Sequence, residues 1–462
     1  MGPSSFLFVR EMKKKIRITS LPEKMVTDLN KIGLTKSQLN NAFRFIDLVK
    51  SKSFRNNKSY DTGVQLPYAY LSKVFNKHLY EWLTPLKESG VIQVLENNEG
   101  KEVYSTKLGL CKTYNLNPTY FSNSSIQYQL NTYMSPVFEE TEQYQAFQSY
   151  KEMVSEDLKD LDYDYKKLKE IASKKIDSIT IDSFKTGETV SANYFQVIIK
   201  KKESQYKYWM TKENALRIAK EDNLTLIQDH KTFYITNAEE FIITKKNVYK
   251  DAYFGSIEKI EKGYWYADRN STNNRLDSNI TNLCGDLMEE IIKENNLVQF
   301  DLANSQFAIL SHILKTKEDI KEKTDFLTFK ELSETGELYS YIQEVLSLNS
   351  RKEAKIMLFE LLFSSEKNRS ENKKKITNLF PSVVKWIDDY KKLNGYENFA
   401  IMLQQEESKI FIDDIYHTLK DKELFCLTKH DSIIVKKENQ DEVEKFLTEY
   451  FDSINFIAKL VK

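Results

Sequence analysis

The chain has 462 residues, of which 40% are hydrophobic and 29% charged, with only 12 Gly and 7 Pro. This composition favours a helix-rich globular protein of two or three domains over a disordered chain or a β-sandwich. The formal net charge is zero, but residues 1–120 carry +9 and the remainder −9. A basic N-terminal region followed by a mildly acidic remainder is compatible with a nucleic-acid-binding module joined to a carboxylate-bearing enzyme.

The cysteines and apolar runs define the expected compartment. Cys111, Cys284 and Cys426 occur without a C-x-x-C pair or a neighbouring His, so we expect reduced cysteines of a cytoplasmic protein and no zinc site. No apolar run approaches 18 residues, and we expect no membrane span and no membrane partner. Residues 1–35 are expected to be an N-terminal extension, since the opening apolar stretch is too short for a signal peptide.

Residues 36–120 predict a basic domain of the winged-helix type. Helical spacing of apolar residues ends at Gly90, and two strands separated by an Asn-Asn-Glu-Gly turn follow. The order helix, helix, helix, hairpin is typical of domains that bind DNA or RNA duplexes through the second helix and the wing. Lys73, Lys77 and Lys101 are candidate contacts to nucleic acid. The alternative is a protein-contact module with a basic face.

Residues 121–230 are predicted to be mostly helical, as a linker or a reduced thumb. Their charged amphipathic piece at 150–178 is expected to expose its charges to solvent. Short β-rich runs appear from about 190 to 267, and strands then alternate with long helices to the end. The fold class is therefore predicted to be α+β.

Two isolated Asp residues end apolar runs in the C-terminal part. The run 298–300 leads to Asp301, where a helix is expected to start at once, and the run 424–430 leads to Asp431. Two carboxylates at the tips of buried strands predict a site for two Mg²⁺ ions, which Mn²⁺ could replace. Such an ion pair stabilises both the attacking and the leaving oxygen of a phosphoryl transfer. Taken singly, Asp301 could also be a satisfied helix cap.

The stretch 351–364 predicts a helix with an unusual face. Arg351, Lys355, Phe359 and Phe363 are each four positions apart and therefore share one side of the helix. Two cations followed by two rings could bind a triphosphate and then cover the base and sugar of the same nucleotide. Considered alone, this pattern also fits an ordinary amphipathic helix.

These features together resemble the family A DNA polymerases and their relatives, the phage-type single-subunit RNA polymerases. The stretch 351–363 resembles their fingers helix. Four further stretches follow the family's order: a palm segment that contacts template and primer, motif A around the first Asp, a piece after the fingers helix, and motif C around the second Asp. They lie at 275–283, 298–312, 380–387 and 429–432.

The resemblance implies roles for individual residues. Asp301 and Asp431 would bind metal, and His430 would meet the primer end. Together with the two cations of the fingers helix they form the implied catalytic set: Asp301, Asp431, Lys355, Arg351 and His430. The residues implied to bind the incoming nucleotide are Arg351, Lys355, Phe359, Phe363 and Gln306. Those implied to hold the primer–template are Arg275, Asn282 and Gln404.

Sugar choice depends on a few positions within these motifs. Gln306 lies five residues after the motif A Asp, where the DNA polymerases carry a Glu that excludes the ribose 2′-OH and the RNA branch carries Gly. Phe359 occupies a position that is Phe or Tyr in DNA polymerases and Met in the RNA branch. Both favour deoxynucleotides. Ser432 matches the RNA branch instead, and Phe363 departs from the usual Tyr.

The resemblance implies a palm of antiparallel sheet and helices over 231–462, with compact helical fingers inserted at about 316–400. It predicts an enzyme that adds dNTPs to the 3′ end of a DNA or RNA/DNA primer–template, from a phage, plasmid or other mobile element. No proofreading exonuclease is expected. One alternative is a single-subunit RNA polymerase or primase-like enzyme that uses NTPs. Another is an inactive replication or transcription factor that binds DNA. The sequence does not indicate whether the chain has a protein partner.

Overall fold

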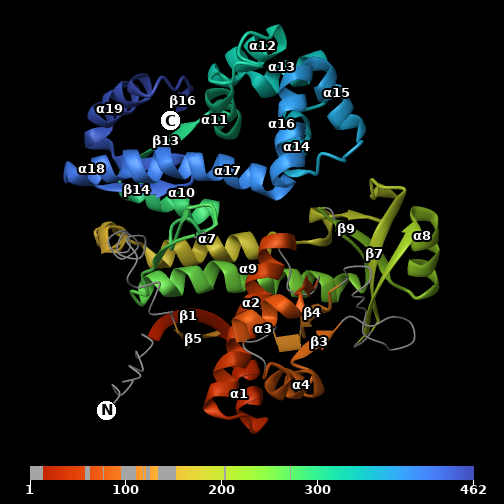
Figure 1. Ribbon diagram of the computed structural model, residues 1–462. Coiled ribbons are helices and arrows are strands. Elements are labelled where there is room, and N and C mark those ends of the chain that lie inside the picture. The colour runs from red at the N-terminus through yellow and green to blue at the C-terminus, as the bar shows by residue number, and fades with distance from the viewer. Residues whose placement is uncertain are drawn as a thin grey trace, which may run out of the picture. The chain divides into compact units, whose positions relative to one another are not determined.

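The computed structural model of the chain comprises two compact units (Figure 1). Unit 1 contains residues 1–141 and 165–264, and unit 2 contains residues 142–164 and 265–462. Both units combine helices with β-sheets, so the predicted α+β class is confirmed. The residues that the structure describes are 14–57, 63–75, 78–94, 111–117, 119–120, 125–133, 152–201, 204–230, 232–270 and 272–462.

The division differs from the predicted domains. The predicted boundary at 231 precedes α9 (Ala238–Glu261), a helix that belongs to unit 1. The segment 142–164, predicted as part of a linker or thumb, belongs to unit 2. The chain therefore enters unit 2, returns to unit 1 and enters unit 2 again.

Unit 1 contains the strands and helices of the first half of the chain. In order they are β1 (Lys14–Pro22), α1 (Glu23–Lys31), α2 (Lys36–Asn57), β2 (Val64–Gln65), α3 (Tyr68–Phe75), α4 (Tyr80–Glu88), β3 (Ile92–Val94), β4 (Thr113–Leu116), β5 (Ser125–Tyr133), α7 (Tyr165–Asp177), η2 (Ile181–Ser183), β6 (Lys185–Thr186), η3 (Gly187–Thr189), β7 (Tyr194–Lys201), β8 (Ser204–Thr211), α8 (Lys212–Glu221), β9 (Thr225–Asp229), β10 (Thr232–Thr236) and α9.

The first part of unit 1 packs α2, α3 and α4 near a three-stranded antiparallel sheet of order β2-β4-β3. Its core is aromatic, since Phe45 makes edge-on contacts with Trp82 and Tyr114 at ring-centroid distances of 5.7 and 5.2 Å. Gly90 follows α4 with φ +71, a conformation that favours glycine and ends the helix as predicted.

Parts of the predicted winged-helix domain lie outside the described residues. These are the expected second wing strand with Lys101, the whole of Lys77, and the side chain of Lys73 in α3. The described strand β3 pairs with β4, which comes later in the chain than the expected hairpin.

A five-stranded sheet of order β6-β9-β10-β7-β8 forms the second part of unit 1. The range 121–230 contributes β5 to β9 as well as α7 and α8, and β7 to β9 lie in the stretch from about 190 where short β-rich runs were predicted. In β7 the alternating residues Phe195, Val197 and Ile199 bury their side chains in one core cluster with Ala215 of α8. A period of two with β-branched and aromatic residues favours a strand over a helix.

Unit 2 contains the second half of the chain. Its elements are β11 (Ala267–Arg269), β12 (Leu276–Ser278), α10 (Gly285–Glu294), β13 (Leu297–Leu302), α11 (Ser305–Leu314), α12 (Thr324–Glu334), α13 (Leu338–Val345), α14 (Arg351–Phe363), α15 (Glu371–Leu379), α16 (Pro381–Asn394), α17 (Tyr396–Ser408), η4 (Lys409–Tyr416), α18 (His417–Asp421), β14 (Cys426–Lys429), β15 (Ser432–Lys436), η5 (Lys437–Asn439), α19 (Gln440–Ser453) and β16 (Leu460–Val461).

The sheet that positions the candidate site has the order β14-β15-β13-β16, and all its neighbouring strands are antiparallel. Helices α12 to α16 gather at one side of unit 2 (Figure 1). Their core is continuous with α11, because the rings of Phe307 and Phe329, and of Phe329 and Phe380, meet edge-on at 6.4 and 5.4 Å.

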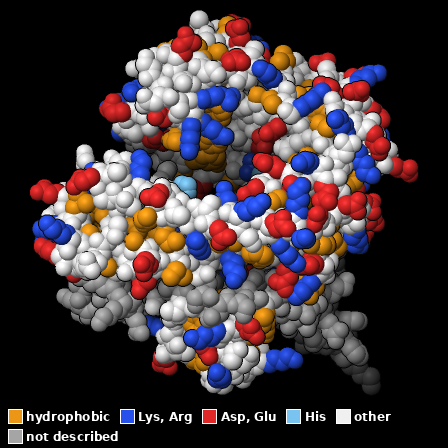
Figure 2. Space-filling view, turned by 180° about the vertical axis from the view of Figure 1, so that it is seen from behind, with side chains coloured by type: hydrophobic (Ala, Val, Ile, Leu, Met, Phe, Trp, Pro, Cys, Tyr) orange, Lys and Arg blue, Asp and Glu red, His pale blue; other side chains and the backbone are white. Residues whose placement is uncertain are grey.

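The surface shows no separation of charge on the face drawn in Figure 2, where Lys and Arg side chains are interspersed with Asp and Glu. Among the described helices, none combines the length and the apolar character needed to cross a membrane. Because the charges on the face in Figure 2 are interspersed, recognition of a polyanion there would depend on local groups rather than on one large basic face.

Candidate active site

Strand β13 and helix α11 position Asp301. Phe300 and Leu302 are buried on either side of it, and Asp301 lies half-buried at the end of the strand. Its Oδ1 accepts a hydrogen bond from the backbone N–H of Leu302 at 3.0 Å. Asn304 has φ +55, so the chain turns sharply and α11 begins at Ser305. The predicted strand followed at once by a helix is confirmed.

The hairpin of β14 and β15 positions Asp431. Lys429 pairs with Ser432, so the turn consists of His430 and Asp431, with His430 at φ +60. Strand β13 pairs with β15 so that Asp301 lies opposite Ser432, the neighbour of Asp431. The two carboxyl groups therefore lie at the same end of adjacent strands, although they are far apart in the sequence.

Both burial and charge act on Asp301. Its pKa is raised to about 6, mainly because the carboxyl group is buried and next because the Asp431 carboxylate lies nearby. The Leu302 N–H and the cations of Lys355 and Lys429 act in the opposite direction on this pKa. The site thus concentrates negative charge that a bound cation would neutralise.

The donor set fits a hard divalent cation. Both side chains offer only carboxylate oxygen, and Mg²⁺ is commonly held by one or two carboxylates together with water and substrate phosphates. No group of three or more His, Cys, Asp or Glu side chains that could hold a metal occurs in the described part of the chain. This composition suits a metal shared with a substrate better than a cage of protein ligands.

Helix α14 presents the predicted row of side chains. It runs from Arg351 to Phe363, and Ser350 caps it by accepting a hydrogen bond from the Glu353 N–H at 3.3 Å. The Lys355 Nζ lies over the ring of Phe359 at 5.4 Å, and this ring stacks on Phe363 at 5.5 Å. The predicted helix is confirmed.

Two aromatic residues that the sequence analysis missed connect α14 to the strand tips. Tyr339 of α13 lies under the guanidinium of Arg351 at 5.2 Å, and Phe307 of α11 meets both Tyr339 and Phe359 edge-on. The pKa of Tyr339 is raised to about 12 chiefly by burial, with Arg351 opposing and Asp431 adding to the shift. Tyr339 is therefore close to both the helix and the carboxylates.

Glu407 of α17 is a further buried carboxyl group that the sequence analysis missed. Its side chain is 1% exposed and accepts hydrogen bonds from Nε of Arg275 at 2.8 Å and from Nε2 of Gln306. Its pKa is raised to about 7 by burial, against the opposing effect of Arg275. A helical period would have indicated its burial, because Phe399 and Leu403 precede it at intervals of four.

Two buried polar atoms near this cluster have no hydrogen-bond partner among the described residues: Nδ1 of His430 and Oε1 of Gln306. The pKa of His430 is lowered by burial and then by the Arg275 cation, so its ring is neutral near pH 7. Buried polar atoms are normally paired, and these two are available to water or a ligand.

The remaining predicted contacts, Gln404, Asn282 and Arg275, have partners within unit 2. Gln404 accepts a hydrogen bond from Asn273 at 2.9 Å, on the loop that leads to Arg275. Asn282 donates to the hydroxyl of Tyr266 at 2.9 Å and to the carbonyl oxygen of Ser278 at 3.2 Å. The Arg275 guanidinium is largely committed to Glu407.

No model of a known protein family matches this sequence, and no curated protein is significantly similar to it. A functional hypothesis therefore depends on the residues themselves and on their geometry.

Proposed function

We propose that this chain is a nucleotidyltransferase that adds nucleotides, preferentially dNTPs, to the 3′ end of a primer–template. The observation that carries the proposal is the surroundings of Asp301. Its half-buried carboxyl group is close enough to Asp431 and Lys355 for both to influence its ionisation, although the three residues come from separate segments. Two carboxylates near a lysine of α14 suit phosphoryl transfer. In this reaction charge develops on the transferred phosphate and on the leaving pyrophosphate.

The architecture is compatible with a family A type of polymerase. In this proposal the antiparallel sheet β14-β15-β13-β16 acts as the palm. Helices α12 to α16 act as compact fingers, and α2 to α4 with their three-stranded sheet act as a winged-helix-like module. The sequence resemblance described above supports this interpretation, and the strand-tip positions of Asp301 and Asp431 agree with it.

Asp301 and Asp431 would hold the divalent metal, Mg²⁺ or Mn²⁺. When bound, two such ions stabilise the attacking and leaving oxygens. Arg351 and Lys355 are exposed on α14 and would bind the triphosphate, while Phe359 offers a ring for the base or sugar. The Asp301 carboxyl group must be ionised to bind a cation, which its pKa of about 6 permits above that pH.

His430 and Gln306 would act next to these groups. The neutral ring of His430, beside Asp431, would contact the primer end. Gln306 would approach the sugar of the incoming nucleotide, with its amide oriented by the hydrogen bond that it donates to Glu407. Because a side chain of this size would oppose a ribose 2′-OH in that position, we expect dNTPs to be preferred.

Primer extension on defined templates tests the proposal. The chain should extend a primer with dNTPs only when Mg²⁺ or Mn²⁺ is present. Asp301→Asn and Asp431→Asn should each lower the rate by about 1000-fold, since each removes charge stabilisation from the transition state. Asp441→Asn is the control, because Asp441 is an exposed carboxylate on α19.

Three outcomes would count against parts of the proposal. Full activity of both Asp variants would refute the catalytic assignment. Extension with NTPs in preference to dNTPs would favour the RNA polymerase or primase-like alternative. Failure to extend any primer with either class of nucleotide would favour an inactive DNA-binding factor.

A further inference from the structure

The five-stranded sheet of unit 1 has two unlike faces. Phe195 and Val197 of β7 point toward α8 and lie in the core. Tyr194 and Gln196 alternate with them and therefore point to the opposite face. The register of β7 and β8 places Trp209 opposite Gln196, so Trp209 belongs to that same opposite face.

The opposite face is covered only in part. Ile198 and Tyr234 are buried there against Phe241 of α9. Tyr194 and Trp209, in contrast, are 62% and 63% exposed, and their rings stack on each other at 5.6 Å with an interplanar angle of 24°. Two large rings held together in solvent are unusual for a surface without a ligand.

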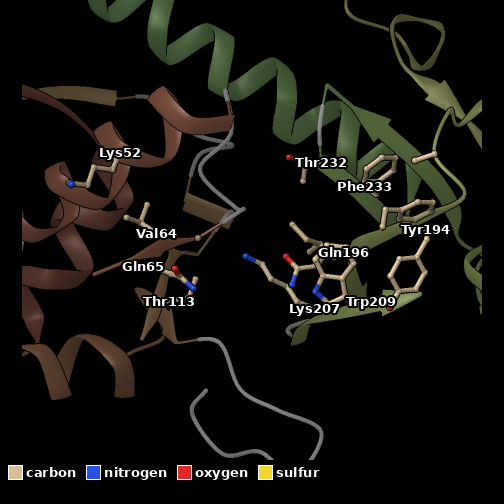
Figure 3. Close-up of a pocket in the computed structure, with 14 residues that line it drawn as sticks. Lys52, Val64, Gln65, Thr113, Tyr194, Gln196, Lys207, Trp209, Thr232 and Phe233 are labelled. Atoms are coloured by element: carbon tan, nitrogen blue, oxygen red, sulfur yellow. The ribbon is translucent and has the colours of Figure 1, made fainter. Parts of the chain in front are cut away.

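A hollow of about 760 Å³ lies beside these rings (Figure 3). Figure 3 shows Lys207 extending into it from the side of Tyr194 and Trp209, with Gln65 and Thr113 across from it. The described residues that line the hollow include Lys52 and Lys207 but no Asp or Glu.

The charge around the rings is positive. Lys207 lies opposite Ile198 in the register and is thus on the same face as Trp209, and the Nζ of Lys200 lies over the ring of Tyr234 at 5.3 Å. Asp229, a nearby carboxylate of β9, is paired with Lys245 and buried. Among the described residues, this face therefore combines flat rings with cations.

We propose that this face of the five-stranded sheet binds single-stranded nucleic acid. Bases would stack on Tyr194 and Trp209, and a phosphate would lie near Lys207. Stacking on exposed rings, with cations along the backbone, is the usual way that proteins bind single strands without sequence preference. An acidic protein partner would also meet the cations, but it would not need two parallel rings. The inference does not depend on the polymerase activity proposed above.

Binding of a short oligothymidylate to the full chain, measured by fluorescence anisotropy, tests this site. The variant Tyr194→Ala/Trp209→Ala should raise the Kd at least tenfold, which corresponds to ~1.4 kcal/mol. Lys207→Gln should weaken binding less, and it should reduce the slope of log Kd against log salt by about one contact. Tyr264→Ala, an exposed ring of unit 1 outside the sheet, should leave the Kd unchanged.

Photo-crosslinking separates this site from other nucleic-acid contacts. With 4-thiothymidine in the oligonucleotide, we expect crosslinks within 194–211, and we expect them to persist in Asp301→Asn. An unchanged Kd for the double variant, with an unchanged melting temperature, would overturn the proposal. Crosslinks confined to other segments would also overturn it. Should the double variant unfold, Lys207→Gln with its salt slope decides the matter.

Discussion

Glu407 shows how a single buried carboxyl group can organise a site. Removing a charge from water is costly unless partners compensate, and here Arg275 and Gln306 both donate to it. The arrangement fixes the orientation of the Gln306 amide, which in our proposal faces the sugar. Glu407 would therefore act as a positioning residue for sugar selection.

The stability of the chain should depend on pH through Glu407. Its pKa is about 7 in the folded protein against an ordinary 4.5, so between these values the folded state holds a proton that the unfolded state releases. The free energy of unfolding should consequently fall as the pH rises through this window. Urea unfolding in EDTA at about pH 5 and about pH 8 should show this decrease, and Glu407→Gln should reduce it. Glu406→Gln serves as the control, and an equal decrease in the Glu407 variant would contradict the assignment.

Selection between ribose and deoxyribose should depend on Gln306 together with Glu407, which holds its amide, rather than on Gln306 alone. Gln306→Gly should raise NTP incorporation relative to dNTP incorporation by about tenfold or more, because the side chain that opposes the 2′-OH is lost. The exchange Gln306→Glu/Glu407→Gln keeps one carboxylate and one amide in contact, and it should retain discrimination. Competition assays with both nucleotide classes measure this. An unchanged ratio in Gln306→Gly would exclude it as the selecting residue.

At the scale of elements, helix α14 is held at its C-terminal end by a lysine from α16. Lys391 is 2% exposed and donates to the carbonyl oxygens of Leu361 and Ser364 at 2.6 and 2.7 Å. Carbonyl groups at a helix end lack partners within the helix, and a cation there satisfies them. This contact determines where the rings at the end of α14 lie.

Replacing this lysine should loosen α14. Lys391→Met should lower the free energy of unfolding by about 2 kcal/mol, because it leaves two buried carbonyl groups without a donor. Lys392→Met provides a matched control at the exposed neighbouring position. Urea unfolding measures both variants, and equal stability of the two would show that the Lys391 contacts contribute little.

Two exposed lysines of α14, Lys355 and Lys352, should differ in their effect on catalysis. Lys355→Ala should lower kcat/KM for nucleotide addition about 100-fold, since Lys355 is near the Asp301 carboxyl group and would neutralise phosphate charge. Lys352→Ala, on the same helix and also exposed, should have little effect. Steady-state primer extension distinguishes them, and comparable losses in both variants would argue for a general effect on the helix.

At the scale of the whole molecule, unit 2 is completed by a segment that precedes most of it in the sequence. Asp157 pairs with Lys420 at 2.7 Å, and the Asp162 N–H donates to Asn295 at 2.7 Å. Residues 152–164 therefore contact the rest of unit 2, residues 265–462, although residues 165–264 of unit 1 lie between them in the sequence.

A fragment of residues 265–462 should consequently be less stable than the same fragment with 152–164 supplied. We expect a peptide of residues 152–164 to raise the melting temperature of the fragment by several degrees, roughly 1 kcal/mol of stabilisation. The peptide with Asp157→Ala, which cannot pair with Lys420, is the control. Thermal unfolding with no response to either peptide would contradict the role of this segment.

The sequence by itself determined the local features of the candidate site. A strand ending at Asp301, a strand ending before Asp431 and a helix with Arg351 and Lys355 on one face all follow from periods of two and 3.6 residues, which depend only on near neighbours. The α+β class followed from the same patterns. The strands β5 and β6 did not, because short mixed runs satisfy both periods.

Only the tertiary structure decided which distant residues meet. The contacts of Glu407 with Arg275 and Gln306 span 132 and 101 positions, and no local pattern specifies them. The Lys391 contacts with α14 and the return of the chain to unit 2 are of the same kind. They arise because burial forces each polar group to find a partner wherever the packed elements bring one, and that choice belongs to the whole fold.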